Sequence, residues 1–148
     1  MRSTIPYKGH IISFTFYKHS LKPTIVMLHG FLASTYSFRK LIPLLQEHFQ
    51  IMSIDIPPFG ESEKSNTCLF SYDHMADAVR YIMKDQSIDK AIFLGHSMGG
   101  QISLRFAYKY PDHIDRLYLL APCSFMRHSP LFAKAICHNP LSPFIARS

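Results

Sequence analysis

A six-residue motif around Ser97 carries the strongest chemical signal in the chain. It reads Gly-His-Ser-Met-Gly-Gly over residues 95–100, follows the apolar run 91–94 and precedes a segment with helical spacing. Between a strand and a helix, such a motif exposes its serine on a sharp turn at a helix amino end, where the dipole favours negative charge. Gly95 and Gly99 lack a Cβ, which lets strand and helix approach. The motif predicts Ser97 as a nucleophile; the alternative is a glycine-rich turn with an ordinary surface serine.

Two further motifs follow apolar runs that are typical of buried strands. His-Gly-Phe (29–31) comes directly after residues 24–28, and Asp-x-Pro-x-x-Gly-x-Ser (55–62) comes after residues 49–54. Continuous apolar runs indicate strands covered on both faces of a parallel sheet. Further strands are expected at 90–94 and 114–121, each separated from its neighbour by a stretch with helical spacing.

The segments between these strands have helix signals, and the chain begins with a hairpin signal. A helix is expected from residue 34 or 35 to 45, with a kink or break at Pro43. Ser71 is expected to cap a second helix, and a third runs from the Ser97 motif to about residue 110. Residues 7–17 predict a short hairpin. The fold class is therefore α/β, a mostly parallel sheet with helices on both faces.

Composition and charge exclude several classes of protein. The chain has 148 residues, enough for one core, and its net charge of +6 is scattered rather than gathered into a nucleic-acid footprint. No apolar run approaches the ~20 residues of a membrane span, and the amino end lacks a signal-peptide pattern, so a cytoplasmic location is expected. The three cysteines are widely spaced and predict free thiols; neither a metal site nor a cofactor site is expected.

Together the three motifs resemble those of the α/β-hydrolase superfamily, over about residues 5–123. The most similar branch has an HGF-type oxyanion loop and includes carboxylesterases, lactonases, carbon–carbon bond hydrolases and cofactor-free haloperoxidase-like enzymes. The resemblance implies a serine hydrolase that cleaves an ester, lactone or related acyl bond of a small molecule. It implies these site residues: Ser97 as nucleophile, the backbone N–H groups of Phe31 and Met98 as oxyanion hole, and His29 and Gly30 as loop support.

Other residues of the motifs are assigned away from the chemistry. His96 is the alternative base, but a side chain next to the nucleophile points away from it on such a turn, so a structural role is expected. Asp55 has the type of a triad acid, yet the resemblance places it in a supporting role. Serine rather than aspartate at position 97 argues against a dehalogenase or epoxide-hydrolase mechanism, and the single glycine after His29 argues against the HGGG esterases.

The chain departs from the family at the triad acid and base. Members order serine, then Asp or Glu, then His. Downstream of Ser97 the acids stand at 112 and 115, just before and at the start of the last expected strand, and the histidines at 113, 128 and 138. The sequence therefore predicts a fold truncated after its sixth strand. Residues 1–122 would be the first part of the core, and the proline-rich residues 123–148 would begin a lid.

This departure leaves three hypotheses about function. The first is a serine hydrolase in a truncated form, and the second is a non-catalytic remnant or interaction protein that keeps the first half of the fold. The third is a complementation half that obtains its acid and base from another chain. Strand 114–121 is apolar and lacks proline and lysine, so self-association through its open edge is also expected.

Overall fold

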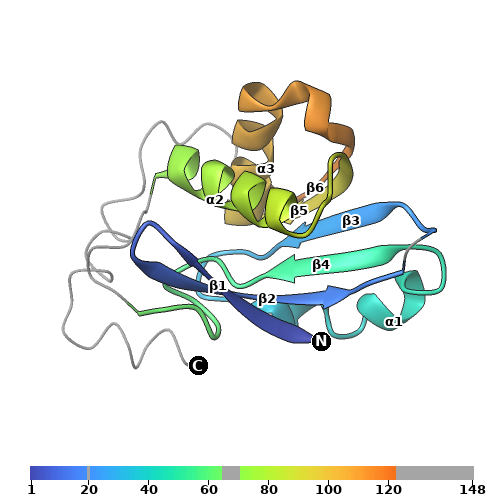
Figure 1. Ribbon diagram of the computed structural model, residues 1–148, viewed down its shortest axis with the longest axis horizontal. Helices are drawn as coiled ribbons and strands as arrows, with labels where there is room; N and C mark the ends of the chain where they lie inside the picture. The colour runs from blue at the N-terminus through green and yellow to red at the C-terminus, as the bar shows by residue number, and fades with distance from the viewer. Residues whose placement is uncertain (20, 65–70, 123–148) are drawn as a thin grey trace.

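A computed structural model shows a six-stranded sheet with helices on both faces (Figure 1). It describes residues 1–19, 21–64 and 71–122. The strands are β1 (Arg2–Tyr7), β2 (His10–Tyr17), β3 (Thr24–Leu28), β4 (Gln50–Ile54), β5 (Ala91–His96) and β6 (Ile114–Leu120). The helices are η1 (Thr35–Phe38), α1 (Ile42–Leu45), α2 (Tyr72–Asp85), α3 (Met98–Lys109) and η2 (Pro111–His113). The expected α/β class and mostly parallel sheet are confirmed.

The strand order β1-β2-β4-β3-β5-β6 brings the ends of β3, β4 and β5 together. These three strands and β6 are parallel, whereas the hairpin β1–β2 joins β4 in antiparallel fashion. Leu28 lies opposite both Ile54 and Gly95, the residues at or near the ends of β4 and β5. The three motifs of the sequence therefore leave the sheet at one shared edge, because parallel strands end on the same side.

Two apolar clusters hold the layers together. The larger lies between the sheet and the pair α2 and α3, and includes Phe93, Ile82 and Phe106, all inaccessible to solvent. The smaller lies on the other face, where Phe38 and Ile42 of η1 and α1 pack on the central strands. Buried apolar surface contributes about 25 cal/mol per Å², so these clusters are the main source of stability.

Polar contacts fix α3 against α2. Arg105 donates to both carboxylate oxygens of Asp73 at 2.7 and 3.0 Å, and Lys109 pairs with Asp77. The Tyr110 hydroxyl donates to the same Asp77 carboxylate at 2.7 Å, which raises the pKa of Tyr110 to about 12. These contacts fix the carboxyl-terminal half of α3 against α2.

Most predicted element boundaries agree with the structure, and two differ. The hairpin begins at Arg2, not near Tyr7, and its two-residue turn at Lys8 and Gly9 has positive φ at both positions, as a type I′ turn requires. The helix expected over 35–45, with a kink or break at Pro43, is interrupted as expected, but the break falls at residues 39–41: η1 ends at Phe38, and Pro43 lies in the first turn of α1. Of the two possible caps for the first helix, Ser34 and Thr35, the structure has Ser34, and the cap predicted at Ser71 is confirmed.

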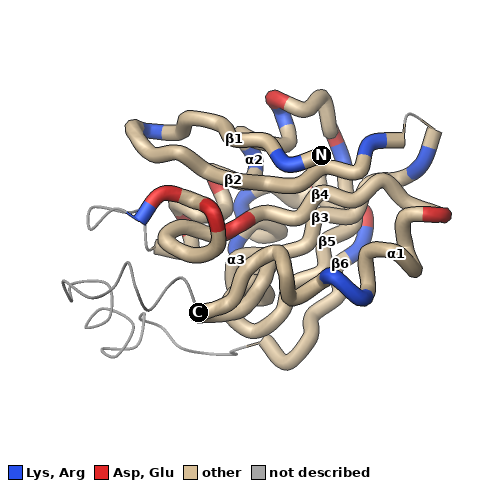
Figure 2. The backbone as a smooth tube through the Cα atoms, turned by 90° about the horizontal axis from the view of Figure 1, so that it is seen from below, with Lys and Arg blue, Asp and Glu red and all other residues tan. Residues whose placement is uncertain are grey.

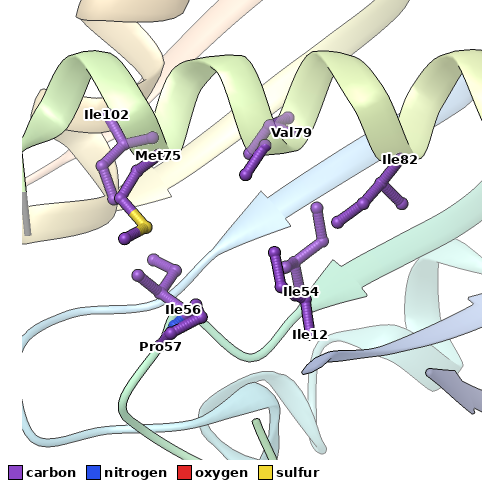
Figure 3. A pocket seen from close by; sticks show the side chains of 9 residues that line it. Ile12, Ile54, Ile56, Pro57, Met75, Val79, Ile82 and Ile102 are labelled. Atoms are coloured by element: carbon purple, nitrogen blue, oxygen red, sulfur yellow. The ribbon is translucent and has the colours of Figure 1, made fainter. Parts of the chain in front are cut away.

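A small apolar cavity lies between α2 and the sheet (Figure 3). Its walls include Ile12, Ile54, Met75, Val79 and Ile82, and its volume is about 10 Å³. A cavity of this size has room for about one water molecule, and a buried water needs polar groups to which it can hydrogen-bond. The apolar lining offers none, so the cavity is a packing gap rather than a ligand site.

Charges are distributed over several elements of the described chain (Figure 2), with Lys and Arg interspersed among Asp and Glu. Each helix within the described residues is too short or too polar to cross a bilayer.

Candidate functional site

Ser97 lies in a strained turn between β5 and α3. Its φ is 51° and its ψ is −112°, a backbone conformation that residues other than glycine rarely adopt. Its N–H donates to Leu120 O at 3.0 Å, and its own carbonyl accepts from Gly100 N at 3.0 Å. Such strain costs on the order of 1–3 kcal/mol and persists only where the surroundings enforce it, most often at functional sites.

Two glycines make this turn possible by removing side-chain atoms. A Cβ built on Gly99 would lie 2.0 Å from Leu28 O, at the end of the neighbouring strand β3. One built on Gly95 would lie 2.6 Å from Gly99 O and from Ser103 Oγ. The steric reason that the sequence predicts for both glycines is therefore confirmed: α3 begins in backbone contact with the sheet.

Gly99→Ala is expected to destabilise the fold by about 3 kcal/mol or more, because a β3 carbonyl must move to admit the methyl group. Gly9→Ala is the matched control, since Gly9 has open space around it and a φ of +82°. That change carries only the left-handed backbone penalty of roughly 1–2 kcal/mol. Urea unfolding followed by circular dichroism measures both, and an equal cost for the two variants would contradict the steric argument.

The loop after β3 lies directly against the Ser97 turn. A Cβ on Gly30 would come within 3.3 Å of Ser97 Cβ and 2.9 Å of His96 Nδ1, so the backbone at Gly30 approaches the serine closely. Phe31 follows, its ring packed edge-on against Phe59 at 5.3 Å between centroids.

Met98 is the first residue of α3, and the N–H groups of a helix's first turn have no acceptor within the helix. The structure thus brings residues 30 and 97–98 together. The oxyanion-hole roles of Phe31 and Met98 stay a prediction.

His29 is fully buried beneath this loop and uses both ring nitrogens. Nε2 accepts the Ile56 N–H at 2.8 Å, so the proton is on Nδ1, which donates to Gly30 O at 2.8 Å. Burial lowers the pKa of His29 below its ordinary 6.5, opposed by the bond to Gly30. The imidazole is therefore neutral at pH 7 and its nitrogens are occupied, which leaves it without a free position for proton transfer.

The pKa of His29 predicts a pH-dependent stability. His29 is protonated near pH 6.5 in the unfolded chain but stays neutral to a lower pH in the folded chain. The contribution of His29 to the free energy of unfolding is therefore constant above pH 6.5 and falls below it. The slope reaches at most about 1.4 kcal/mol per pH unit. Urea unfolding at pH 7.5, 6.5 and 5.5 measures it, and His29→Gln removes this component. His48→Gln, at an exposed histidine, is the control; an unchanged slope in His29→Gln would refute the assignment.

Asp55, in the loop after β4, connects that loop by hydrogen bonds to the loop after β3. Its carboxylate accepts Thr35 N–H at 2.7 Å and Glu61 N–H at 3.1 Å, and its side chain is 1% exposed. Ser62 Oγ donates to Asp55 O and accepts the N–H of Ser13 in β2. His29 thus holds the loop after β4, and Asp55 holds the loop after β3. The carboxylate has a supporting position, with both oxygens engaged.

The acids and the histidine that follow Ser97 in the described chain lie at the other end of the sheet. β6 runs parallel to β5, with Ala91 opposite Ile114 and His96 opposite Leu120. At about 3.3 Å per residue, the amino end of β6 is roughly 20 Å from the Ser97 turn. His113 is fixed there by its bond to Asp89 O at 2.6 Å. Residues 112–115 therefore do not complete a triad, and positions 128 and 138 lie outside the described residues.

His96 is exposed, and its ring lies beside Gly30 rather than in the core. Its structural role stays a prediction. In the described part of the chain, no group of three or more His, Cys, Asp or Glu residues could hold a metal ion.

Comparison with known proteins identifies the family. The sequence profile described as "alpha/beta hydrolase fold" matches residues 23–139, which include all three motifs. The chain belongs to the α/β-hydrolase family. It is 42% identical to the uncharacterized hydrolase YugF of Bacillus subtilis over 117 residues, covering 77% of this chain and 43% of that protein.

Solved α/β-hydrolase structures agree with this assignment. The epoxide hydrolase CorEH superposes with a TM-score of 0.78 at 28% identity, over 92% of this chain and 48% of that one. Est816, described as an N-acyl homoserine lactone degrading enzyme, superposes with a TM-score of 0.74 at 25% identity, over 81% and 45% of the two chains. The chain spans less than half the length of the first curated relatives that it matches.

Proposed function

We propose that this α/β-hydrolase chain provides the nucleophile and the oxyanion hole of a serine hydrolase acting on an ester, a lactone or a related acyl bond. The observation that carries the proposal is the φ of 51° at Ser97, held at the amino end of α3 against Gly30. Backbone strain of this kind is concentrated at functional sites, and in a strand–turn–helix motif of this type it exposes the serine hydroxyl to substrate. The similarity to Est816 supports an acyl substrate such as a lactone.

In the proposed reaction, Ser97 Oγ attacks the carbonyl carbon and its proton passes to a base. The carbonyl oxygen becomes an oxyanion that accepts hydrogen bonds from the N–H groups of Phe31 and Met98, helped by the dipole of α3. Collapse of this intermediate expels the alcohol, which takes the proton, and leaves an acyl-serine. Water then attacks the acyl carbon and gives one proton to the base, forming a second oxyanion. Collapse of this oxyanion breaks the bond between the acyl carbon and Ser97 Oγ, which takes the proton back from the base, and the acid is released. Each oxyanion-hole donor contributes on the order of 10²–10³ in rate.

The base and the acid of the triad are proposed to come from outside the described residues. His29 and Asp55 have their hydrogen-bonding atoms engaged, and residues 112–115 lie at the far end of the sheet. We assign residues 1–122 to the core of the hydrolase and 123–148 to the beginning of a lid. A non-catalytic or interaction role is the competing proposal, and it predicts no dependence of any activity on Ser97.

The proposed function is tested by hydrolysis of p-nitrophenyl acetate and by phosphonofluoridate labelling. A chimera with residues 1–122 in place of the matching segment of YugF provides a full-length hydrolase, because the two share 42% identity over 117 residues. Hydrolysis that depends on Ser97 supports the proposal. Hydrolysis that does not depend on Ser97 favours a different catalytic group.

A further inference from the structure

The loop proposed to carry one oxyanion-hole donor is anchored at both ends. At its start, Gly30 O accepts from His29 Nδ1 at 2.8 Å and from Ala33 N at 3.3 Å. At its end, the N–H of Thr35 donates to Asp55 Oδ1 at 2.7 Å. Phe31 lies between these anchors, so the direction of its N–H depends on both.

The anchor at Thr35 depends on a buried negative charge. The Asp55 side chain is 1% exposed, and burying a carboxylate without a partner costs folding free energy. Removing one partner of a buried ion pair is therefore strongly destabilising. Its two backbone donors are neutral groups. A cation that pairs with this carboxylate is Arg2 of β1, with Nη2 at 4.0 Å from Asp55 Oδ2.

Arg2 contacts three parts of the same support. Its Nη2 also donates to Thr35 Oγ1 at 3.4 Å, and its Nη1 lies 3.9 Å from Glu61 Oε1. Thr35 ends the loop after β3, while Asp55 and Glu61 belong to the loop after β4. A planar guanidinium can address several acceptors at once, whereas a lysine ammonium acts as a single point charge. The first strand of the chain thereby reaches the anchor of the loop.

We propose that Arg2 is a positioning residue for the oxyanion loop, acting through Thr35 and Asp55. The inference rests on the proposed function, because it assigns Arg2 a role in the same site. An exposed ion pair contributes about 0–1 kcal/mol, and Arg2 itself is 50% exposed. The pair of Arg2 and Asp55 differs from an ordinary surface ion pair, because the Asp55 carboxylate is buried away from bulk water.

Amide hydrogen exchange of the 148-residue chain, followed by NMR, tests the proposal. Arg2→Gln is expected to accelerate exchange at Thr35 and Glu61 roughly fivefold to tenfold, with Phe93 in β5 unchanged, because the opening is local. Arg2→Lys restores part of the protection. Arg39→Gln is the matched control: this arginine stacks on Tyr36 and donates to Tyr36 O, without contact to Asp55. Unchanged exchange at Thr35, or equal acceleration at Phe93, overturns the proposal.

The rate at which excess phosphonofluoridate modifies Ser97, measured in the chimera with YugF, gives a second readout that a purely structural role of Arg2 would not change in this pattern. It is expected to fall severalfold in Arg2→Gln, to recover partly in Arg2→Lys and to stay constant in Arg39→Gln. A rate that is equal in all four proteins overturns the link to the oxyanion loop. Failure of the proposed function has a different signature: Ser97 is not modified in any of them, while the exchange at Thr35 still decides whether Arg2 holds the loop.

Discussion

Ser97→Ala is expected to abolish hydrolysis of p-nitrophenyl acetate by the chimera with YugF, with a loss on the order of 10⁶ in kcat. The reason is the removal of the only atom that forms the acyl bond in the proposed mechanism. Alanine keeps a Cβ and tolerates the φ of 51° no better and no worse than serine. Circular dichroism and the unfolding midpoint of the variant should therefore match those of the parent.

Ser37→Ala is the matched control, because Ser37 is an exposed serine in η1, which follows the loop after β3. It should leave turnover and labelling unchanged. Retained turnover in Ser97→Ala, with Ser37→Ala also active, would remove the serine-nucleophile assignment. A loss of both turnover and cooperative unfolding would instead show that position 97 is needed for the fold.

The 148-residue chain by itself is expected to hydrolyse the same ester several orders of magnitude more slowly than the chimera. Its oxyanion hole is proposed to be present, but its triad base is proposed to come from outside the described residues, so only residual catalysis is expected to remain. Rapid stoichiometric labelling of Ser97 in this chain would reveal another base, and His128 and His138 would be the first positions to substitute.

Local signals predicted the strands and the Ser97 turn because each depends on neighbours in the sequence. The continuous apolar runs became β3, β4 and β5, and the glycines at 95 and 99 fill positions where any Cβ would collide with backbone. Pro43 marked the interruption that divides η1 from α1. The start of the hairpin was misplaced because β1 carries Arg, Ser, Thr and Pro, with only two buried side chains in six residues.

The supports of the site could not be predicted, because they join residues distant in the sequence. His29 and Ile56 are 27 positions apart, and Thr35 and Asp55 are 20 apart. The sequence gives the residue types but not which N–H meets which acceptor. Arg2 gave no signal at all: it is a lone cation near the amino end, and its contacts with Thr35 and Asp55 exist only because β1 pairs with β2 beside β4.

The 148-residue chain is expected to self-associate through the edge of the sheet at β6. Within the described residues, β6 pairs with β5 alone and ends the strand order. Tyr118 is 49% exposed and Leu120 46% exposed; they lie opposite Leu94 and His96 of β5, and Leu94 packs against the smaller apolar cluster. An edge strand with unpaired N–H and C=O groups and apolar neighbours pairs readily with another chain.

Multi-angle light scattering at micromolar concentration is expected to give a mass above the 17.1 kDa of one chain. Replacing Tyr118 and Leu120 together by lysine should shift the mass to that of the monomer, because lysine on an edge strand opposes pairing. Tyr108→Lys is the control, since Tyr108 is 77% exposed on α3 and is not part of the edge strand. A sharp monomer peak for the unsubstituted chain, with cooperative thermal unfolding, would show that the edge is already covered. Association that persists in the double variant and is lost in Tyr108→Lys would move the interface from β6 to α3.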